Sequence, residues 1–212
     1  MGLSIIAKTE VSRGIRSCLL LVALLVISGL LAIQHDSSIQ PSIVGYARET
    51  PLRAVAEQWQ KLGATLGIVL FLLASLGGTG RIMLRTALTF IVTISCSGVV
   101  VQGLKHIVGR VRPNDANYAT IFIGPNLTSN LDSMPSGHTV AAFAMAFALS
   151  GRYPKSANLW YLLAAGVAVS RVIVDRHFPS DVLLGAALGI GIGWIVRWSF
   201  NRRELHHIEI GE

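Results

Sequence analysis

Long apolar runs without charge dominate this chain and alternate with short polar segments. A helix that crosses a bilayer needs about 20 apolar residues, so the shorter runs are weak signals when each is taken alone. Arg171 and Asp181 limit the last two runs at one membrane face, where both charges can sit in a protein pocket rather than in lipid. The pattern predicts an all-α integral membrane bundle of six transmembrane helices. The runs are Ser17 to Gln34, Leu62 to Gly80, Thr86 to Leu104, Ser133 to Gly151, Ser156 to Ser170 and Val182 to Val196.

Two further patterns concern helix packing. Thr50 and Pro51 resemble the start of a helix, and apolar residues then recur at helical spacing, namely Leu52, Val55, Ala56, Trp59 and Leu62. A helix over 51–62 would lie in the membrane interface or pack against the bundle, and both arrangements stay open. In the last run, Gly185, Gly189 and Gly193 recur every four residues, which predicts close contact with a neighbouring helix. No linker divides the chain, so residues 1–212 are expected to form a single membrane-embedded domain.

Composition supports a membrane protein rather than a water-soluble one. Hydrophobic residues make up 52% of the chain and charged residues 14%, whereas soluble domains carry about a quarter charged residues. The net charge of +7 could indicate a nucleic-acid partner, but Lys and Arg are scattered between the apolar runs and form no basic stripe. We therefore expect the bilayer as partner, with no nucleic acid and no obligatory protein partner.

The distribution of Lys and Arg predicts the orientation of the chain. With a cytoplasmic N-terminus, ten basic residues fall on the inner side and eight on the outer side. Lys105, Arg112 and Arg171 belong to polar clusters with a separate reason to lie outside, which leaves ten against five. The positive-inside rule then favours cytoplasmic N- and C-termini. A cleaved signal peptide is the alternative for the first run, but a cut after Ala32 would put bulky Leu30 where a small residue is required.

The first polar cluster is the segment KHIVGRVRP, from Lys105 to Pro113. If the third helix continues through it, Lys105 and Arg112 share one face and lie about 10 Å apart along the axis. His106 then points away from that face and is expected to lie in the membrane interface. Cations at the end of a membrane helix often only extend toward the lipid headgroups. This cluster therefore indicates a binding site only in combination with the other two clusters.

The second cluster is Pro135-Ser136-Gly137-His138, which directly precedes the fourth apolar run. Ser136 is a candidate N-cap, and Gly137 lets a bound group approach the backbone. The amides of a first helical turn attract anions. The segment therefore has the form of a phosphate cradle, although Ser and Gly begin many helices.

The third cluster is SRVIVDRHFPSD, from Ser170 to Asp181. His177 lies four residues before Asp181 across a turn that contains Pro179. A carboxylate that holds one imidazole nitrogen leaves the other free to act as a nucleophile. A single His-Asp pair is more often structural than catalytic. This segment therefore indicates a catalytic site only in combination with the other two clusters.

The three segments together resemble the signatures of the type-2 phosphatidic acid phosphatase superfamily. All three are complete and in order within residues 105–181. Cations, two histidines and an acid at one face of an apolar bundle are also energetically unfavourable in a membrane, and such groups usually have a functional role. The signatures are Lys105 separated by six residues from Arg112-Pro113, then Pro135-Ser136-Gly137-His138, then Ser170-Arg171 separated by five residues from His177, which three residues separate from Asp181.

The resemblance implies a role for each signature residue. His177 would be the nucleophile, Asp181 would orient it, and His138 would be the general acid and then the base. The phosphoryl oxygens would be held by Lys105, Arg112, Ser136, Gly137 and Arg171. No metal or other cofactor is expected, because the carboxylates of Asp115, Asp132 and Asp175 stand isolated in the sequence.

The expected function is that of a multi-pass lipid phosphatase in a bacterial inner membrane, with its site on the non-cytoplasmic side. It would hydrolyse a phosphomonoester or diphosphate of a lipid through a phosphohistidine. The substrates considered are phosphatidic acid, phosphatidylglycerol phosphate, polyprenyl diphosphates and lipid A phosphates. Two alternatives are a protein of this fold that binds or transports phospholipid without turnover, and an enzyme like the vanadate-dependent haloperoxidases.

Overall fold

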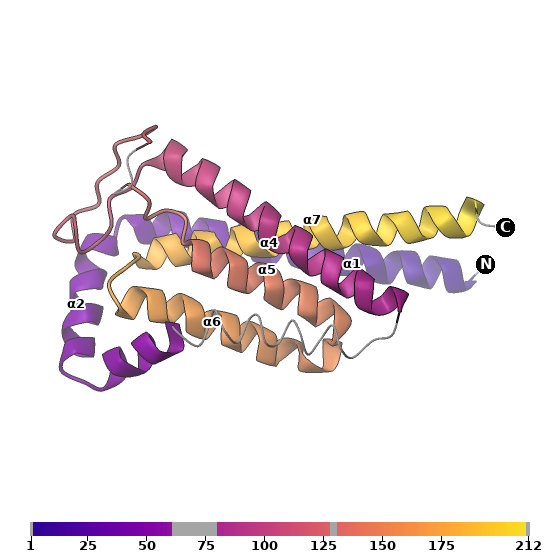
Figure 1. Ribbon diagram of the computed structural model, residues 1–212, viewed down its shortest axis with the longest axis horizontal. Coiled ribbons are helices and arrows are strands. Elements are labelled where there is room, and N and C mark those ends of the chain that lie inside the picture. The colour runs from indigo at the N-terminus through magenta and orange to yellow at the C-terminus, as the bar shows by residue number, and fades with distance from the viewer. Residues whose placement is uncertain (1, 61–79, 128–130, 211–212) are drawn as a thin grey trace.

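The computed structural model describes residues 2–60, 80–127 and 131–210, which form helices joined by turns and one longer loop (Figure 1). The helices are α1 (Gly2–Ile33), α2 (Asp36–Arg48), α4 (Arg81–Val108), α5 (Gly137–Arg152), α6 (Ala157–Ile173) and α7 (Pro179–Ile210), with a 3-10 turn at Pro154–Ser156. Residues 52–60 are helical as well. Within these ranges there is no β-strand, and Arg110 forms isolated bridges with Phe122 and Asp132. The predicted crossing over 62–80 lies outside the described residues except at Gly80.

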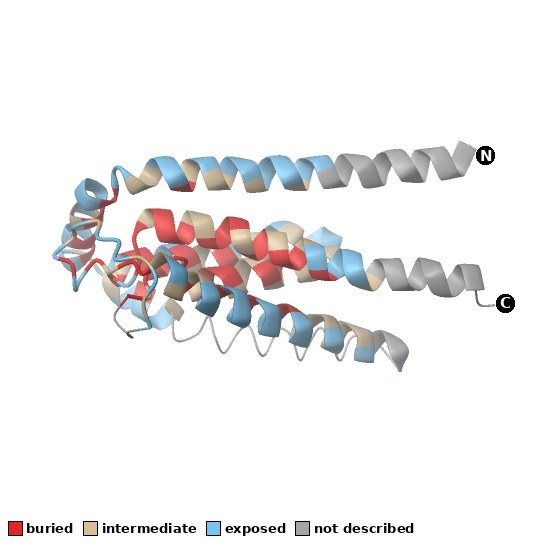
Figure 2. Cartoon of the chain, turned by 90° about the horizontal axis from the view of Figure 1, so that it is seen from above, coloured by how far each residue is buried: buried red, intermediate tan, exposed pale blue. Residues whose placement is uncertain are grey.

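Helices α5 and α7 form the centre of an elongated bundle. Helix α7 packs against α1, α4 and α5, and α5 also packs against α4 and α6. Buried residues are most frequent on α7 and occur on α5 and α6 as well, whereas most of the part of α1 with described side chains is exposed or half-buried (Figure 2). Helix α2 crosses one end of the bundle, and α1 begins and α7 ends at the opposite end (Figure 1).

Glycines allow α7 to approach α5 closely. A Cβ atom on Gly189 would lie 2.4 Å from the Val140 carbonyl oxygen, and one on Gly193 would lie 2.9 Å from Phe147 Cβ. Larger side chains at these positions would push the helices apart. The close contact predicted from the four-residue glycine spacing is confirmed.

The outside of the bundle is apolar. Leu20 on α1 is 71% exposed and Val99 on α4 is 75% exposed, and they are two of many exposed large hydrophobic residues. A water-soluble protein rarely exposes so much apolar surface. Four described segments are long and apolar enough to cross a membrane, namely Arg16–Ile33, Leu84–Val108, Pro154–Ile173 and Pro179–Phe200. The all-helical membrane class is confirmed.

Helix α2 forms where the hydrophobic pattern predicts no element. Its buried positions are Asp36, Gln40, Val44 and Ala47, which share one helix face at near four-residue spacing. Two of the four are polar, and Pro41 lies inside the helix. A search for apolar periodicity therefore overlooks it.

Candidate active site

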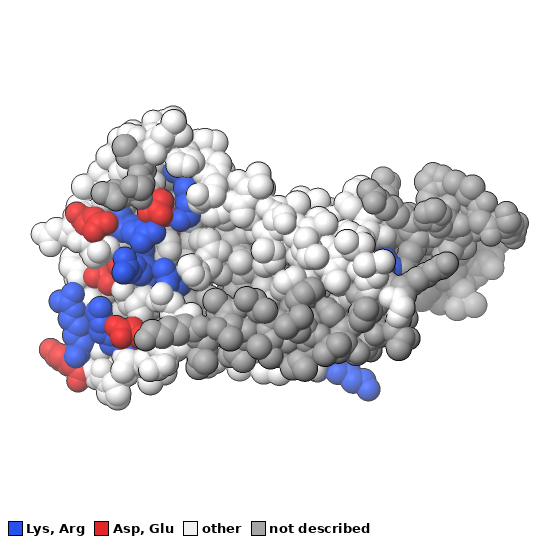
Figure 3. Space-filling view, viewed as in Figure 1, with Lys and Arg blue, Asp and Glu red and all other residues white. Residues whose placement is uncertain are grey.

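The three polar clusters meet at the end of the bundle that α2 covers. The first follows α4, the second begins α5, and the third joins α6 to α7. Ser133 Oγ donates a hydrogen bond to Asp181 Oδ2 at 2.6 Å, and the Ser136 amide donates to the Asp181 carbonyl at 3.1 Å. On the face shown in Figure 3, most of the described charged side chains gather at this end, and the flank is largely uncharged.

Lys105 and Arg112 reach the site by a route that differs from the prediction. Helix α4 ends at Val108, because Gly109 adopts a left-handed conformation with φ 57° and ψ 47° and its amide bonds the Lys105 carbonyl. A Cβ atom at Gly109 would lie 2.0 Å from the Gly124 carbonyl oxygen. Arg112 therefore lies in the loop after α4, and the expectation that one continuous helix carries both cations is wrong.

Asp132 binds both of these cations. Arg112 donates from Nε to Oδ1 at 2.9 Å and from Nη2 to Oδ2 at 2.7 Å. Lys105 Nζ donates to the Asp132 carbonyl at 2.6 Å and lies 3.5 Å from Oδ2. Burial acts to raise the pKa of Asp132, but the hydrogen bonds and charges of the two cations outweigh it and lower that pKa. Asp132 is thus paired with cations rather than with other carboxylates, and its pairing leaves Arg112 Nη1 free of the carboxylate.

The first residues of α5 lie beside these cations. Ser136 occupies the N-cap position with φ −69° and ψ 108°, but its hydroxyl makes no capping bond and instead accepts one from Thr139 Oγ1 at 3.0 Å. Ser136 is fully buried, Gly137 is half-buried and the His138 side chain is exposed. The positive charges of the other two clusters act on His138. The N-terminus of α5 thus points its partial positive charge toward the same place.

His177 lies between α6 and α7 and is only 2% exposed. Its Nδ1 is 2.7 Å from the Ser133 carbonyl oxygen. A carbonyl only accepts hydrogen bonds, so Nδ1 carries the proton and Nε2 bears the lone pair. Asp181 Oδ2 is 3.8 Å from Nδ1, so its charge acts on the ring while Ser133 sets the orientation. Burial lowers the pKa of His177, and Asp181 offsets this only in part.

Arg171 is the third predicted phosphate-binding cation and differs from the other two. Arg171 is 5% exposed, and its Nε and Nη1 atoms have no hydrogen-bond partner in the described part of the chain. A buried cation of this kind is costly unless an anion approaches it. The site therefore contains donors directed at no acceptor among the described residues.

A buried network behind His177 was not anticipated from the sequence. Arg110 Nη1 donates to Asp181 Oδ1 at 2.5 Å and to Ser180 Oγ at 2.7 Å, and Nη2 donates to Asp36 Oδ2 at 2.7 Å. The guanidinium also lies over the Phe178 ring, 4.1 Å from its centroid. Arg110, Asp36 and Asp181 are all fully buried. A charged residue inside the first cluster was a visible signal, but its partners are 71 and 74 residues away.

A second network fastens α2 beside the site. Gln40 Nε2 donates to the Val172 carbonyl and to Asp175 Oδ1, both at 3.1 Å. The Tyr118 hydroxyl donates to Asp175 Oδ2 at 3.2 Å. Asp175 therefore joins α2 and Tyr118 to the α6–α7 turn. His106 also has a local role, because its Nδ1 lies 3.0 Å from the Asn126 carbonyl and ties α4 to the following loop.

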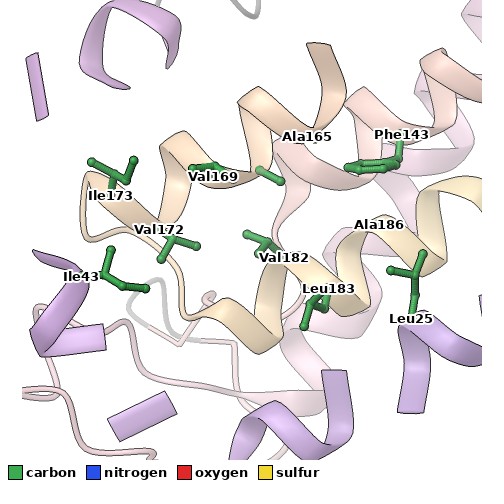
Figure 4. Close-up of a pocket in the computed structure, with 11 residues that line it drawn as sticks. Leu25, Ile43, Phe143, Ala165, Val169, Val172, Ile173, Val182, Leu183 and Ala186 are labelled. Carbon is green, nitrogen blue, oxygen red and sulfur yellow. The ribbon is translucent and has the colours of Figure 1, made fainter. Parts of the chain in front are cut away.

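An apolar groove of about 350 Å³ runs beside the site between α1, α2, α5, α6 and α7 (Figure 4). Val172 and Val182, which directly follow Arg171 and Asp181, form its wall nearest the polar clusters. Leu25 and Phe143 line it farther along the bundle, and Ile43 contributes from α2 (Figure 4). The groove therefore extends from the end of the bundle that holds the polar clusters toward its apolar middle.

Fold and site together define a multi-pass helical membrane protein with cations and two histidines clustered at one end. The PAP2 superfamily model matches residues 86–205, more than half of the chain, and the chain belongs to this family. The resemblance found in the sequence is thereby confirmed.

Relatives of this chain include membrane lipid phosphatases. Lipid A 1-phosphatase of Rhizobium etli is 36% identical over 106 residues, which cover 48% of this chain and 44% of that protein. Bacitracin transport permease protein BcrC of Bacillus licheniformis is 32% identical over 114 residues, covering 51% and 55%. The matched region thus spans about half the length of these curated relatives.

Solved structures show the same fold. The crystal structure of a transmembrane PAP2 type phosphatidylglycerolphosphate phosphatase from Bacillus subtilis superposes with a TM-score of 0.63. The alignment covers 88% of this chain and 95% of that one at 24% identity. At this identity the likeness shows the fold alone.

Proposed function

We propose that this protein is a metal-independent lipid phosphate phosphatase that passes the phosphoryl group first to His177 and then to water. The observation that carries the proposal is a buried imidazole whose Nε2 bears the lone pair, beside a buried Arg171 whose Nε and Nη1 have no partner among the residues that the structure describes. Phosphoryl transfer depends mainly on positioning and on charge stabilisation. These groups supply both.

In the first step His177 Nε2 attacks phosphorus and the P–O bond to the lipid breaks. His138 donates a proton to the departing oxygen, which leaves as the lipid alcohol, or as a lipid monophosphate from a diphosphate. Asp181 stabilises the positive charge of the phosphorylated ring. The nonbridging oxygens are held by Lys105, Arg112 and Arg171 together with Ser136 and Gly137.

In the second step His138, now neutral, accepts a proton from water while the water oxygen attacks phosphorus. The P–N bond breaks, its electron pair returns to Nε2 of His177, and inorganic phosphate leaves. This sequence needs only the two histidines as proton and phosphoryl carriers. Asp132 holds Lys105 and Arg112 in place in the empty site.

The apolar groove supports a lipid as the substrate. Its lining is hydrophobic throughout, and it includes Val172 and Val182, the residues that directly follow Arg171 and Asp181 in the chain. A phosphate bound at the cations would leave the attached hydrocarbon chain next to this groove, where burial of apolar area stabilises it. Phosphatidic acid, phosphatidylglycerol phosphate, a polyprenyl diphosphate and a lipid A phosphate all combine these two parts.

The proposed orientation places six crossings in a bacterial inner membrane, with both termini in the cytoplasm and the site on the opposite side. It is supported by the excess of basic residues in the predicted inner segments. It is also supported by the position of the start of α1 and the end of α7, which lie together at the end remote from the site (Figure 1).

Phosphate release from the four lipids, measured on the purified protein in detergent with EDTA present, tests the proposal. His177→Ala and His138→Ala should lower kcat by roughly a thousandfold or more while the proteins stay folded. His35→Ala is a matched control, because that side chain is exposed at the junction of α1 and α2, and it should retain wild-type activity.

The outcomes separate the alternatives. Full phosphate release by His177→Ala would overturn the phosphohistidine mechanism. Tight lipid binding without phosphate release from any of the four lipids would instead support a binding or transport protein. Loss of activity in EDTA, restored by a divalent cation, would contradict metal independence.

A further inference from the structure

Asp36 lies outside the residues matched by the family model and yet is joined to the site. It begins α2, is fully buried, and pairs with Arg110 at 2.7 Å between Oδ2 and Nη2. The Asp36 carboxylate also accepts two hydrogen bonds from Ser180, one from the backbone amide at 3.2 Å and one from the side-chain hydroxyl. Arg110 in turn pairs with Asp181. Asp36 is thus connected to Asp181 by two separate routes, through the guanidinium and through the adjacent residue of α7.

The charges of this network do not balance among themselves. Asp36 and Asp181 carry two negative charges, and Arg110 carries one positive charge, with all three side chains 0% exposed. An excess charge in such surroundings is costly unless another charge compensates it. Asp181 faces His177, whose Nδ1 is 3.8 Å away. The excess negative charge therefore lies behind the imidazole that becomes a cation when it takes the phosphoryl group.

We propose that Asp36 is a positioning residue for phosphoryl transfer, and this rests on the proposed function above. Through Arg110 and Ser180 it fixes the carboxylate of Asp181, and it supplies the second negative charge that offsets the guanidinium. Without Asp36, Arg110 would neutralise Asp181, and the phosphorylated His177 ring would lose its net counter-charge. With Asp36 present, the network keeps one net negative charge.

The chemistry gives this charge a specific task. Attack by Nε2 forms the N–P bond, and because Nδ1 keeps its proton the ring then carries one positive charge. That proton is held by the Ser133 carbonyl, a dipole that cannot neutralise a full charge. Asp181, supported by Arg110 and Asp36, provides the compensating field. The network should therefore act on kcat and leave substrate binding largely unchanged.

The decisive variant is Asp36→Asn, which keeps the shape of the side chain and removes its charge. We expect kcat to fall roughly 10- to 100-fold, by analogy with the outer partners of metal-ligating histidines, with KM little changed. The substrate is whichever of the four panel lipids the wild type hydrolyses fastest, and kcat is corrected for the folded fraction. Asp175→Asn is the matched control, because Asp175 is also buried near α2 but bonds Gln40 and Tyr118 instead.

A pH profile distinguishes a charge effect from a merely structural one. The charged and titratable groups that face His177 are Asp181 from α7, Arg171 from α6, Lys105 from α4 and His138 from α5. Neutral His177 is the active form, so kcat/KM falls as the pH drops through its pKa. Removing a negative charge behind this ring favours its neutral form. The acid limb of Asp36→Asn should thus move to lower pH, and that of Asp175→Asn should not move.

Wild-type kcat and an unmoved acid limb in folded Asp36→Asn would overturn this inference, as would a loss of activity equal to the loss of folded protein. Arg110→Lys provides a second variant, since Lys keeps the charge but cannot bridge both carboxylates, and it should also lower kcat. If His177→Ala is inactive and Asp36→Asn behaves as wild type, only the role of Asp36 fails. If His177→Ala remains active, the proposed function itself fails.

Discussion

Replacing Arg171 with Met should make the empty protein more stable while removing its activity. Arg171 is 5% exposed, and its Nε and Nη1 have no partner among the described residues. A buried donor without a partner costs about 1–3 kcal/mol. Met keeps an unbranched apolar stem and removes the charge. We therefore expect the free energy of unfolding to rise by roughly 1–3 kcal/mol.

Activity should change in the opposite direction, because the same donors would stabilise the transition state. Loss of one such donor typically lowers kcat by about 10²–10³. Thermal unfolding in detergent, with and without vanadate as a phosphate analogue, measures the first effect. Vanadate at a hundred times its Kd should stabilise the wild type by about 2.7 kcal/mol, and it should stabilise Arg171→Met far less.

Arg176→Met is the matched control, because Arg176 lies in the same α6–α7 turn with an exposed side chain. It should change neither stability nor activity appreciably. If folded Arg171→Met unfolds more easily than the wild type, the guanidinium is already satisfied in the empty site, and the reasoning above is refuted.

Three further changes test other parts of the site. Gly109→Ala should lower the unfolding midpoint and activity, because the left-handed backbone costs about 1–2 kcal/mol for other residues and the new Cβ would meet the Gly124 carbonyl at 2.0 Å; wild-type stability would contradict this. Asp132→Asn should raise KM about fivefold. The change weakens the partly exposed bidentate pair that holds Arg112 in place, and such a pair contributes about 1 kcal/mol. A lower KM would show instead that the carboxylate competes with phosphate for Arg112. The acid limb of kcat/KM should lie below the usual histidine value of about 6.5, because burial lowers the pKa of His177 and the neutral ring is needed; a limb above that value would contradict the assignment.

The sequence was sufficient to predict which residues gather at the site but not how they are held. Lys105 and Arg112 were expected together because they share a helix face at seven-residue spacing. They do meet, on Asp132, but Gly109 ends the helix first. A glycine directly after a last turn that contains Lys105 and His106 is itself a signal for a helix end. The Gly124 carbonyl, which leaves no room for a side chain at Gly109, comes from a loop 15 residues later and is not visible in the pattern.

The partners of His177 lead to the same conclusion. The four-residue spacing of His177 and Asp181 predicts their proximity, and they lie 3.8 Å apart between Nδ1 and Oδ2. The atom that holds Nδ1 is the Ser133 carbonyl. A backbone carbonyl leaves no trace in residue identity, so contacts of this kind are invisible in the sequence.

Helix α2 shows why the pattern of apolar residues is least informative beside a membrane-protein site. In a soluble protein a polar helical position usually faces water, but in α2 Asp36 and Gln40 are fully buried, whereas Ile39 and Tyr46 are 42% and 64% exposed. The helix turns two polar and two apolar side chains toward the protein interior, so the polarity of a residue does not predict which face of α2 is buried. Polar residues at four-residue spacing directly after a membrane crossing therefore deserve to be considered as inward-facing. By that criterion Asp36 and Gln40 are candidates for an inward-facing side, whereas the pairing of Asp36 with Arg110 joins residues 74 positions apart and depends on the folded structure.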